Sequence, residues 1–210
     1  MILQLNKSQL LITILVILYS VGLIGLTTSL RPSFLPLSSI NLFISFILLL
    51  ISFKKHDKIL FGFITLGFTI GMIAEWIGVH TNLLFGDYQY GDNLGPSFFG
   101  VPIIIGFNWV MLCIISGAIA TYFNTHWIVK ALIGTFLMLS LDMLIEPIAI
   151  ISDYWVWNGE IPVSNFIGWF FIALLIQMLY FSMKIEKQNK VAVVLYCIQF
   201  LFFLILNFVL

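Results

Sequence analysis

Seven long apolar stretches divide this chain, and they constrain its fold more than any other feature of the sequence. Each is about 20 residues long, which is the length that a helix needs to cross ~30 Å of hydrocarbon. With 61% hydrophobic and only 9% charged residues, the chain has too few polar groups to cover a water-facing surface. The sequence therefore predicts an all-α, polytopic membrane helix bundle that forms a single transmembrane domain over residues 1–210. The predicted spans are residues 9–29, 35–53, 59–79, 101–123, 128–150, 165–183 and 191–210.

The distribution of positive charge predicts how the bundle is oriented. Lys and Arg accumulate in cytoplasmic loops, and seven spans with a cytoplasmic N-terminus place only Arg31 on the outer side. We therefore expect a multi-pass protein of the cell membrane. The nine basic and nine acidic residues cancel, so there is no basic field to attract nucleic acid. The lysines expected on the inner side are Lys7, Lys54, Lys55, Lys58, Lys130, Lys184, Lys187 and Lys190.

Three carboxylates lie inside the predicted spans and are the candidate catalytic residues: Glu75 in the third span, and Asp142 and Glu146 in the fifth. A central acid disfavours membrane insertion by about 2.5 to 3.5 kcal/mol, so such residues usually face the bundle interior and mark a site. With a rise of ~1.5 Å per residue, all three reach the outer half of the membrane. They either donate protons in a pocket, or they hold helices together as neutral groups or as partners of Arg31 or a Tyr.

Two loops on the acid-bearing side, residues 80–100 and 152–164, contain no Lys or Arg and are rich in aromatic residues. Such aromatics either line a site or form an interfacial belt, and the amides near the helix ends either orient water or pack helices. The candidate substrate-binding residues are Tyr88, Tyr90, Asn108, Trp109, Asp153, Tyr154, Trp155, Trp157, Asn165 and Trp169.

An internal repeat links these regions. Each of two hairpins reads as an acid, an Asp-Tyr loop, a proline and then a tryptophan. This pattern predicts that the fifth and sixth spans repeat the third and fourth. The two pairs would be parallel and related by an axis along the membrane normal. The two sets are Glu75, Asp87-Tyr88, Pro102 and Trp109, and Asp142, Asp153-Tyr154, Pro162 and Trp169.

Several classes of function lack the residues that they require. No set of His, Cys and acidic residues has the spacing of a metal site. The last span has no lysine to form a retinal Schiff base. Phosphate-binding, dinucleotide-binding and nucleophile-elbow motifs are also missing from the sequence. We therefore expect neither a metal nor an organic cofactor.

The loop and helix motifs around the acids resemble those of the membrane-embedded carotenoid hydratases, the CruF type, which include the bisanhydrobacterioruberin hydratases of archaea. The resemblance is carried by FGDYQYGDNLGP, then GVP and a following Trp, and by LDMLIEP, DYWVW and IPVSNFIGW. It covers about half of the chain, whereas the first two spans and the last add only hydrophobicity. One departure is Glu146, which stands where the family has an Asp before the proline.

The resemblance implies a cofactor-independent hydro-lyase that adds water to the terminal double bond of an acyclic carotenoid. Such a reaction needs a carboxylic acid that stays protonated near neutral pH, and an apolar pocket favours this uncharged form. Trp or Tyr faces would stabilise the tertiary cation, and a second carboxylate would take the proton that the attacking water loses. The implied partners are the carotenoid, the lipid bilayer and other enzymes of the pathway.

Three other functions fit the same residues. A carotenoid end-ring cyclase starts with the same protonation but lets an internal double bond trap the cation. A non-catalytic carotenoid-binding subunit would use the acids only to hold helices together, and a proton-coupled carrier would leave every pigment chemically unchanged.

Overall fold

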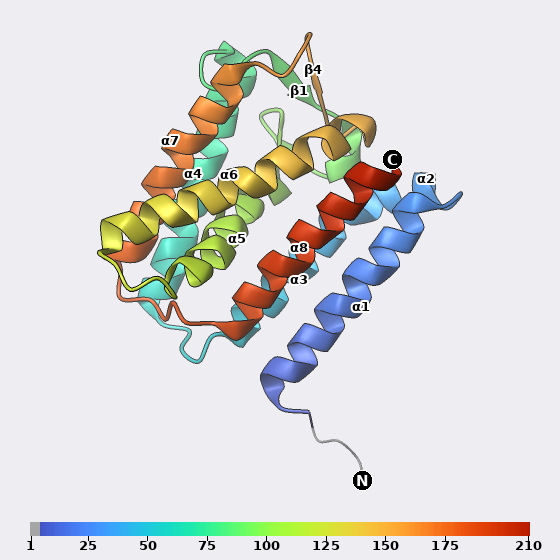
Figure 1. Cartoon of the computed structure of the whole chain (residues 1–210). Helices are drawn as coiled ribbons and strands as arrows, with labels where there is room; N and C mark the ends of the chain where they lie inside the picture. The colour runs from blue at the N-terminus through green and yellow to red at the C-terminus, as the bar shows by residue number, and fades with distance from the viewer. Residues whose placement is uncertain (1–4) are drawn as a thin grey trace.

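The computed structural model describes residues 5–210, and its architecture is an all-α bundle of seven membrane-length helices (Figure 1). This confirms the predicted polytopic membrane fold, and the helix ends lie within a few residues of the predicted ones. The second span, Arg31–Ser52, is composite: α2 (Arg31–Phe34), the 3₁₀ turn η1 (Leu35–Leu37) and α3 (Ser38–Ser52). The other spans are α1 (Lys7–Thr27), α4 (Lys58–Thr81), α5 (Ile103–Ala120), α6 (Trp127–Ile151), α7 (Val163–Ser182) and α8 (Lys190–Val209).

Polar side chains outside the apolar stretches set where several helices begin. Asp57 accepts the backbone N–H groups of the first turn of α4, and Asn189 does the same for α8. Asn6 and Gln9 form a reciprocal capping box at the start of α1. These caps satisfy the unpaired donors of a helix N-terminus, so each helix starts where its apolar run starts.

Helix α5 is the centre of the bundle. It packs against α3, α4, α6, α7 and α8, and most of its residues are buried. Helix α1 lies at one edge, beside α8 and α3 (Figure 1). A hydrophobic helix surrounded by others contributes packing rather than lipid contact, so α5 is the element against which the acid-bearing helices α4 and α6 are positioned.

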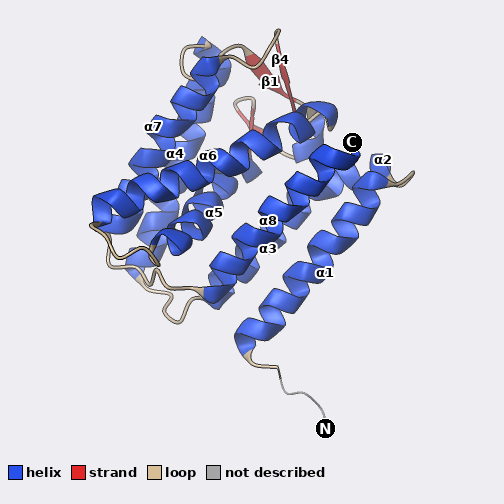
Figure 2. Ribbon diagram, viewed as in Figure 1, coloured by secondary structure: helices blue, strands red, loops and turns tan. Residues whose placement is uncertain are grey.

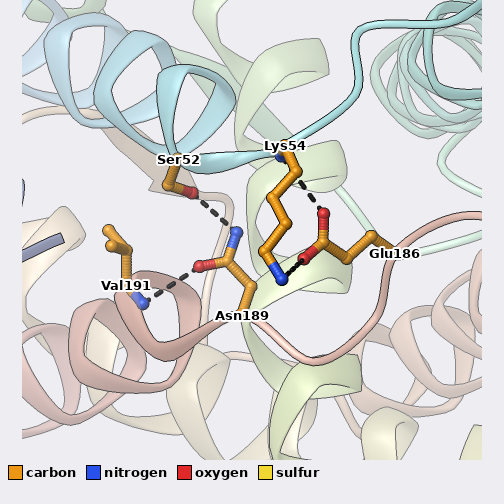
Figure 3. A network of polar contacts seen from close by, with 5 residues as sticks. All are labelled: Ser52, Lys54, Glu186, Asn189 and Val191. Carbon is orange, nitrogen blue, oxygen red and sulfur yellow. Dashed lines mark hydrogen bonds and ion pairs between the residues drawn. The ribbon is translucent and has the colours of Figure 1, made fainter. Parts of the chain in front are cut away.

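A polar network ties together two loops at the end of the bundle where most of the lysines lie (Figure 3). Lys54 pairs with Glu186 at 3.4 Å, and its backbone N–H donates to the same carboxylate. Asn189 donates to the Ser52 hydroxyl over 2.6 Å and also caps the Val191 N–H. The connection between α3 and α4 is thereby joined to the one between α7 and α8, far along the chain.

The aromatic loops at the opposite end form short strands, where the sequence predicted only loops (Figure 2). β1 (Tyr88–Tyr90) pairs antiparallel with β4 (Trp155–Trp157), and the turn η2 (Asp92–Leu94) follows β1. β2 (Ser97–Phe98) pairs with β3 (Val101–Pro102), which occupies the start of the predicted fourth span. Strands of two or three residues are too short to show a periodic pattern in the sequence.

Candidate functional site

Glu75 lies near the C-terminal end of α4 and is surrounded by hydrogen-bond donors. Tyr88 and Tyr90 donate their hydroxyls to its Oε2 over 2.6 and 2.8 Å, and the Trp109 indole donates to its Oε1 over 2.9 Å. The side chain is only 3% exposed. Among residues 5–210, no Lys or Arg forms an ion pair with it. Three donors and no cation make a hydrogen-bonded site for a carboxylate.

Glu146 on α6 has a similar but smaller set of donors. The Trp155 indole donates to its Oε1 over 2.9 Å, and the Trp157 indole donates to the same oxygen. Both bonds end on Oε1, which leaves Oε2 free of them. Glu146 is therefore held in place by two donors while one of its oxygens is left for another partner.

The register of the β1–β4 pair explains why each acid meets two aromatic donors. Alternate residues of a strand point to the same side, so Tyr88 and Tyr90 share one face of β1, and Trp155 and Trp157 share one face of β4. Tyr88 pairs with Trp157 and Tyr90 with Trp155, and the ring centroids lie 5.1 and 6.0 Å apart. The small sheet thus brings four aromatic donors to two acids on different helices.

Corresponding parts of the two hairpins also meet inside the bundle. Trp109 and Trp169, each seven residues after the proline that precedes its helix, stack with centroids 3.9 Å apart and an interplanar angle of 20°. By its strand partners, Glu146 and not Asp142 is the counterpart of Glu75. The parallel repeat itself stays a prediction.

Two glycines of α4 make room for the donors of Glu75. A Cβ on Gly71, one turn before Glu75, would lie 2.7 Å from the Trp109 ring. A Cβ on Gly78 would lie 2.7 Å from the Tyr88 hydroxyl oxygen. Real side chains do not approach this closely, so any larger residue would displace a donor from the acid.

Glu75 and Glu146 both line a small chamber of about 30 Å³. A buried water needs roughly 10 to 15 Å³ and two or more polar partners, so the chamber has room and partners for at least one water molecule. The remaining lining is mostly aromatic: Phe85, Tyr88, Tyr90, Trp155, Trp157 and Trp169, with Ile105, Asn108 and Asn165.

A larger apolar cavity of about 260 Å³ adjoins the chamber. Residues of α1, α3, α5, α6 and α8 line it, together with residues of α2, η1, η2 and the segment Tyr154-Trp155. Ile105, Asn108 and Trp155 belong to both linings, so they form the boundary between the water-sized chamber and the apolar cavity. The site thus consists of a polar chamber that adjoins an apolar cavity.

All the predicted site residues except Asp142, Trp109 and Asp153 line the chamber, the cavity or both. Trp109 still reaches Glu75 directly. Asp142 is buried but lines neither space, and its Oδ2 has no hydrogen-bond partner among residues 5–210. Asp153 is exposed and lines neither space, so the structure does not bring it to the site.

Arg31 does not pair with any of the acids. It donates to the backbone carbonyl of Ile151 over 2.8 Å, at the end of α6. The sequence analysis named Arg31 or a Tyr as partners for acids that only hold helices together. The structure shows tyrosine partners and not Arg31.

Four polar residues of the cavity were missed by the sequence analysis. Three of them, Tyr19, Asn41 and Gln199, come from spans treated as plain hydrophobic helices. The fourth, Ser38, is the first residue of α3 and forms a hydrogen bond with the Tyr154 hydroxyl. The available signal was an isolated hydroxyl or amide within a long apolar run, since such a group needs a partner inside the bilayer.

The tyrosines in the chamber are suited to act as donors. Burial raises the pKa of the Tyr88 hydroxyl, and the charge of Glu75 raises it further. The same two causes raise the pKa of Tyr90 well above its usual value. Both hydroxyls therefore keep their protons at neutral pH and donate to Glu75.

The fold and the site together define a multi-pass membrane protein with a buried carboxyl pair beside an apolar cavity. Residues 35–210 match the sequence model of a family described as carotenoid biosynthesis protein. This match covers most of the chain, and the protein belongs to that family, with a role in carotenoid biosynthesis. Neither a curated protein nor a solved structure matches the chain.

Proposed function

We propose that the protein is a carotenoid hydratase, which adds water to the terminal double bond of an acyclic carotenoid without a cofactor. The observation that carries the proposal is the joining of two spaces: the chamber that holds both acids shares Ile105, Asn108 and Trp155 with the apolar cavity. The cavity suits a branched hydrocarbon end, and the chamber suits water. Membership of a carotenoid biosynthesis family supports a carotenoid as the substrate.

The first step in this proposal is proton transfer from Glu146. Its Oε2 is free of the two indole bonds and gives its proton to the less substituted, inner carbon of the terminal double bond, where a new C–H bond forms from the π electrons. The neighbouring carbon becomes a tertiary cation. The faces of Trp155 and Trp169, which line the chamber, stabilise this cation by about 2 kcal/mol or more in a desolvated site.

Water then attacks the cation, and Glu75 takes the proton that the water loses. Three donors already hold Glu75, an arrangement that suits the negatively charged partner of the pair. A new C–O bond forms and the product is a tertiary alcohol. Return of the proton from Glu75 to Glu146 restores the site, so the net change is the addition of one water molecule.

The same geometry favours hydration over cyclisation. A cyclase has to keep water away from the cation until an internal double bond reaches it. Here both acids line a chamber with polar walls and room for water, directly beside the cavity. The lysines at the opposite end of the bundle support an orientation in which this chamber lies in the outer half of the membrane.

The test is expression in cells that make an acyclic carotenoid, followed by pigment extraction and mass analysis. A hydratase gives a product heavier by one water, a cyclase gives an isomer, and a binding subunit or carrier gives no new pigment. We expect Glu75→Gln and Glu146→Gln to abolish the hydrated product. The matched control is Glu186→Gln, because Glu186 lies at the opposite end of the bundle in a partly exposed ion pair. An isomer, or hydration that survives both amide changes, would overturn the proposal.

A further inference from the structure

The apolar cavity contains one buried polar group whose hydrogen bonding is incomplete. Gln199 on α8 lines the cavity and is 1% exposed. Its Nε2 donates to the Tyr19 hydroxyl over 2.8 Å, but its Oε1 has no partner among residues 5–210. A buried amide oxygen without a donor is unfavourable unless a bound molecule supplies one.

The neighbours of Gln199 hold its amide in a fixed orientation. Tyr19 is itself buried, its ring packs edge-on against Phe202 with centroids 5.2 Å apart, and the Ser45 hydroxyl approaches its oxygen at 3.5 Å. Asn41, which lines the cavity, accepts from the same serine over 3.4 Å. Because Tyr19 holds Nε2, the group of this amide that is left for a ligand is the acceptor Oε1.

The amide lies close to the reaction chamber. The Gln199 Nε2 is 4.0 Å from the Met111 sulfur on α5. Met111 is three residues after Asn108, which borders both the chamber and the cavity, so it lies about one helical turn, ~4.5 Å, further into the bundle. A molecule that occupies the cavity and reaches the chamber therefore passes this acceptor.

We propose that Gln199, oriented by Tyr19, is a specificity-determining subsite that accepts a hydrogen bond from a hydroxyl group on the isoprenoid chain. The inference rests on the proposed function only in taking the cavity as the place of the substrate. A plain hydrocarbon leaves Oε1 unpaired, and a ketone would direct a second acceptor at it. The protein should therefore prefer a hydroxyl-bearing chain to both.

Helix α1 supplies Tyr19, the residue that orients the acceptor. Tyr19 belongs to α1, which lies outside the segment 35–210 that matches the family. The acids and their aromatic donors all lie within that segment. The subsite therefore combines Gln199, which lies inside the matched segment, with Tyr19, which lies outside it.

The test is a competition between an acyclic carotenoid hydrocarbon and chains of the same length that carry one hydroxyl or one keto group. Equal amounts are supplied to membranes containing the full chain, and the hydrated products are measured by mass. We expect wild type to favour the hydroxylated chain by about tenfold or more. Gln199→Met should abolish the preference, and Tyr19→Phe should weaken it, because the amide loses its anchor.

The control is Gln177→Met. Gln177 is also a fully buried amide whose Oε1 lacks a partner in the described part of the chain, but it lines neither the chamber nor the cavity. Its replacement should leave the preference unchanged. The inference is overturned if wild type shows no preference, or if the changes at residues 177 and 199 shift it equally.

A binding measurement separates this inference from the proposed reaction. Each pigment retained by the purified Glu75→Gln protein is quantified, with and without Gln199→Met. Retention of the hydroxylated pigment that depends on Gln199, with no hydration by wild type, would leave the subsite standing and refute the hydratase. Hydration without any preference or selective retention would refute the subsite alone.

Discussion

The two tyrosines that bond to Glu75 give the sharpest test of its charge. Tyr88→Phe and Tyr90→Phe each remove one hydroxyl, at 2.6 and 2.8 Å from the same Oε2, and leave the ring in place. A hydrogen bond to a charged group contributes about 1.5 to 3 kcal/mol, whereas one to a neutral group contributes about 1 kcal/mol. If Glu75 carries the negative charge in the reaction, each change should lower the hydration rate by about 10- to 100-fold.

The double variant adds a check on the geometry. Both hydroxyls end on one oxygen, so their effects should not be independent, and the double variant should lose less than the product of the single losses. The assay is conversion of an acyclic carotenoid in isolated membranes, with protein amounts matched. Tyr122→Phe is the control, because Tyr122 is 64% exposed at the other end of the bundle. Losses of about fivefold or less would show that Glu75 is neutral in the rate-limiting step, and the assigned roles would be wrong.

Three further outcomes are expected from the structure. Gly71→Ala should reduce hydration strongly, measured by pigment mass, because its Cβ would lie 2.7 Å from the Trp109 ring and push the indole from the acid. Burial raises the pKa of Tyr88 and Tyr90 above the value of about 10 for tyrosine in water. Their contribution to stability should therefore be complete below about pH 10 and be lost as the pH rises further. Unfolding curves of wild type and the double Phe variant should converge as the pH rises above about 10. Lys54→Ala should change stability by less than about 1 kcal/mol in the same unfolding assay, because the lysine side chain is 84% exposed.

Much of the fold was predictable because the bilayer imposes a length on each apolar run. The seven spans and their approximate ends follow from that length alone, and caps such as Asp57 and Asn189 mark two of the starts. The acids were also predictable, since Glu75 and Glu146 are costly in hydrocarbon unless they face a site. The 3₁₀ turn at Leu35–Leu37 was not predicted, because the length of an apolar run does not report the local effect of Pro36 on the helix.

The pairing of acids with donors was beyond the sequence. Spacing alone matched Asp142 with Glu75 in the repeat. The structure instead gives Glu146 two indole donors and leaves Asp142 outside both spaces. The difference depends on contacts between β1 and β4, which are more than 60 residues apart, and no local pattern reports such a contact.

The need for that sheet follows from what helices can offer a buried acid. Inside a span, backbone N–H groups are already used by the helix, so a carboxyl has to find its donors among side chains. Neighbouring positions on one helix face are few and mostly apolar here. A strand directs every second side chain the same way, so two short strands paired across the helix ends deliver Tyr88 and Tyr90 to one acid and Trp155 and Trp157 to the other. Because the strands bond to each other, a shift of one pair of donors moves the other pair too. The two acids are therefore positioned as one unit. The proposed reaction requires this, because Glu146 gives a proton to the substrate and Glu75 takes one from the attacking water.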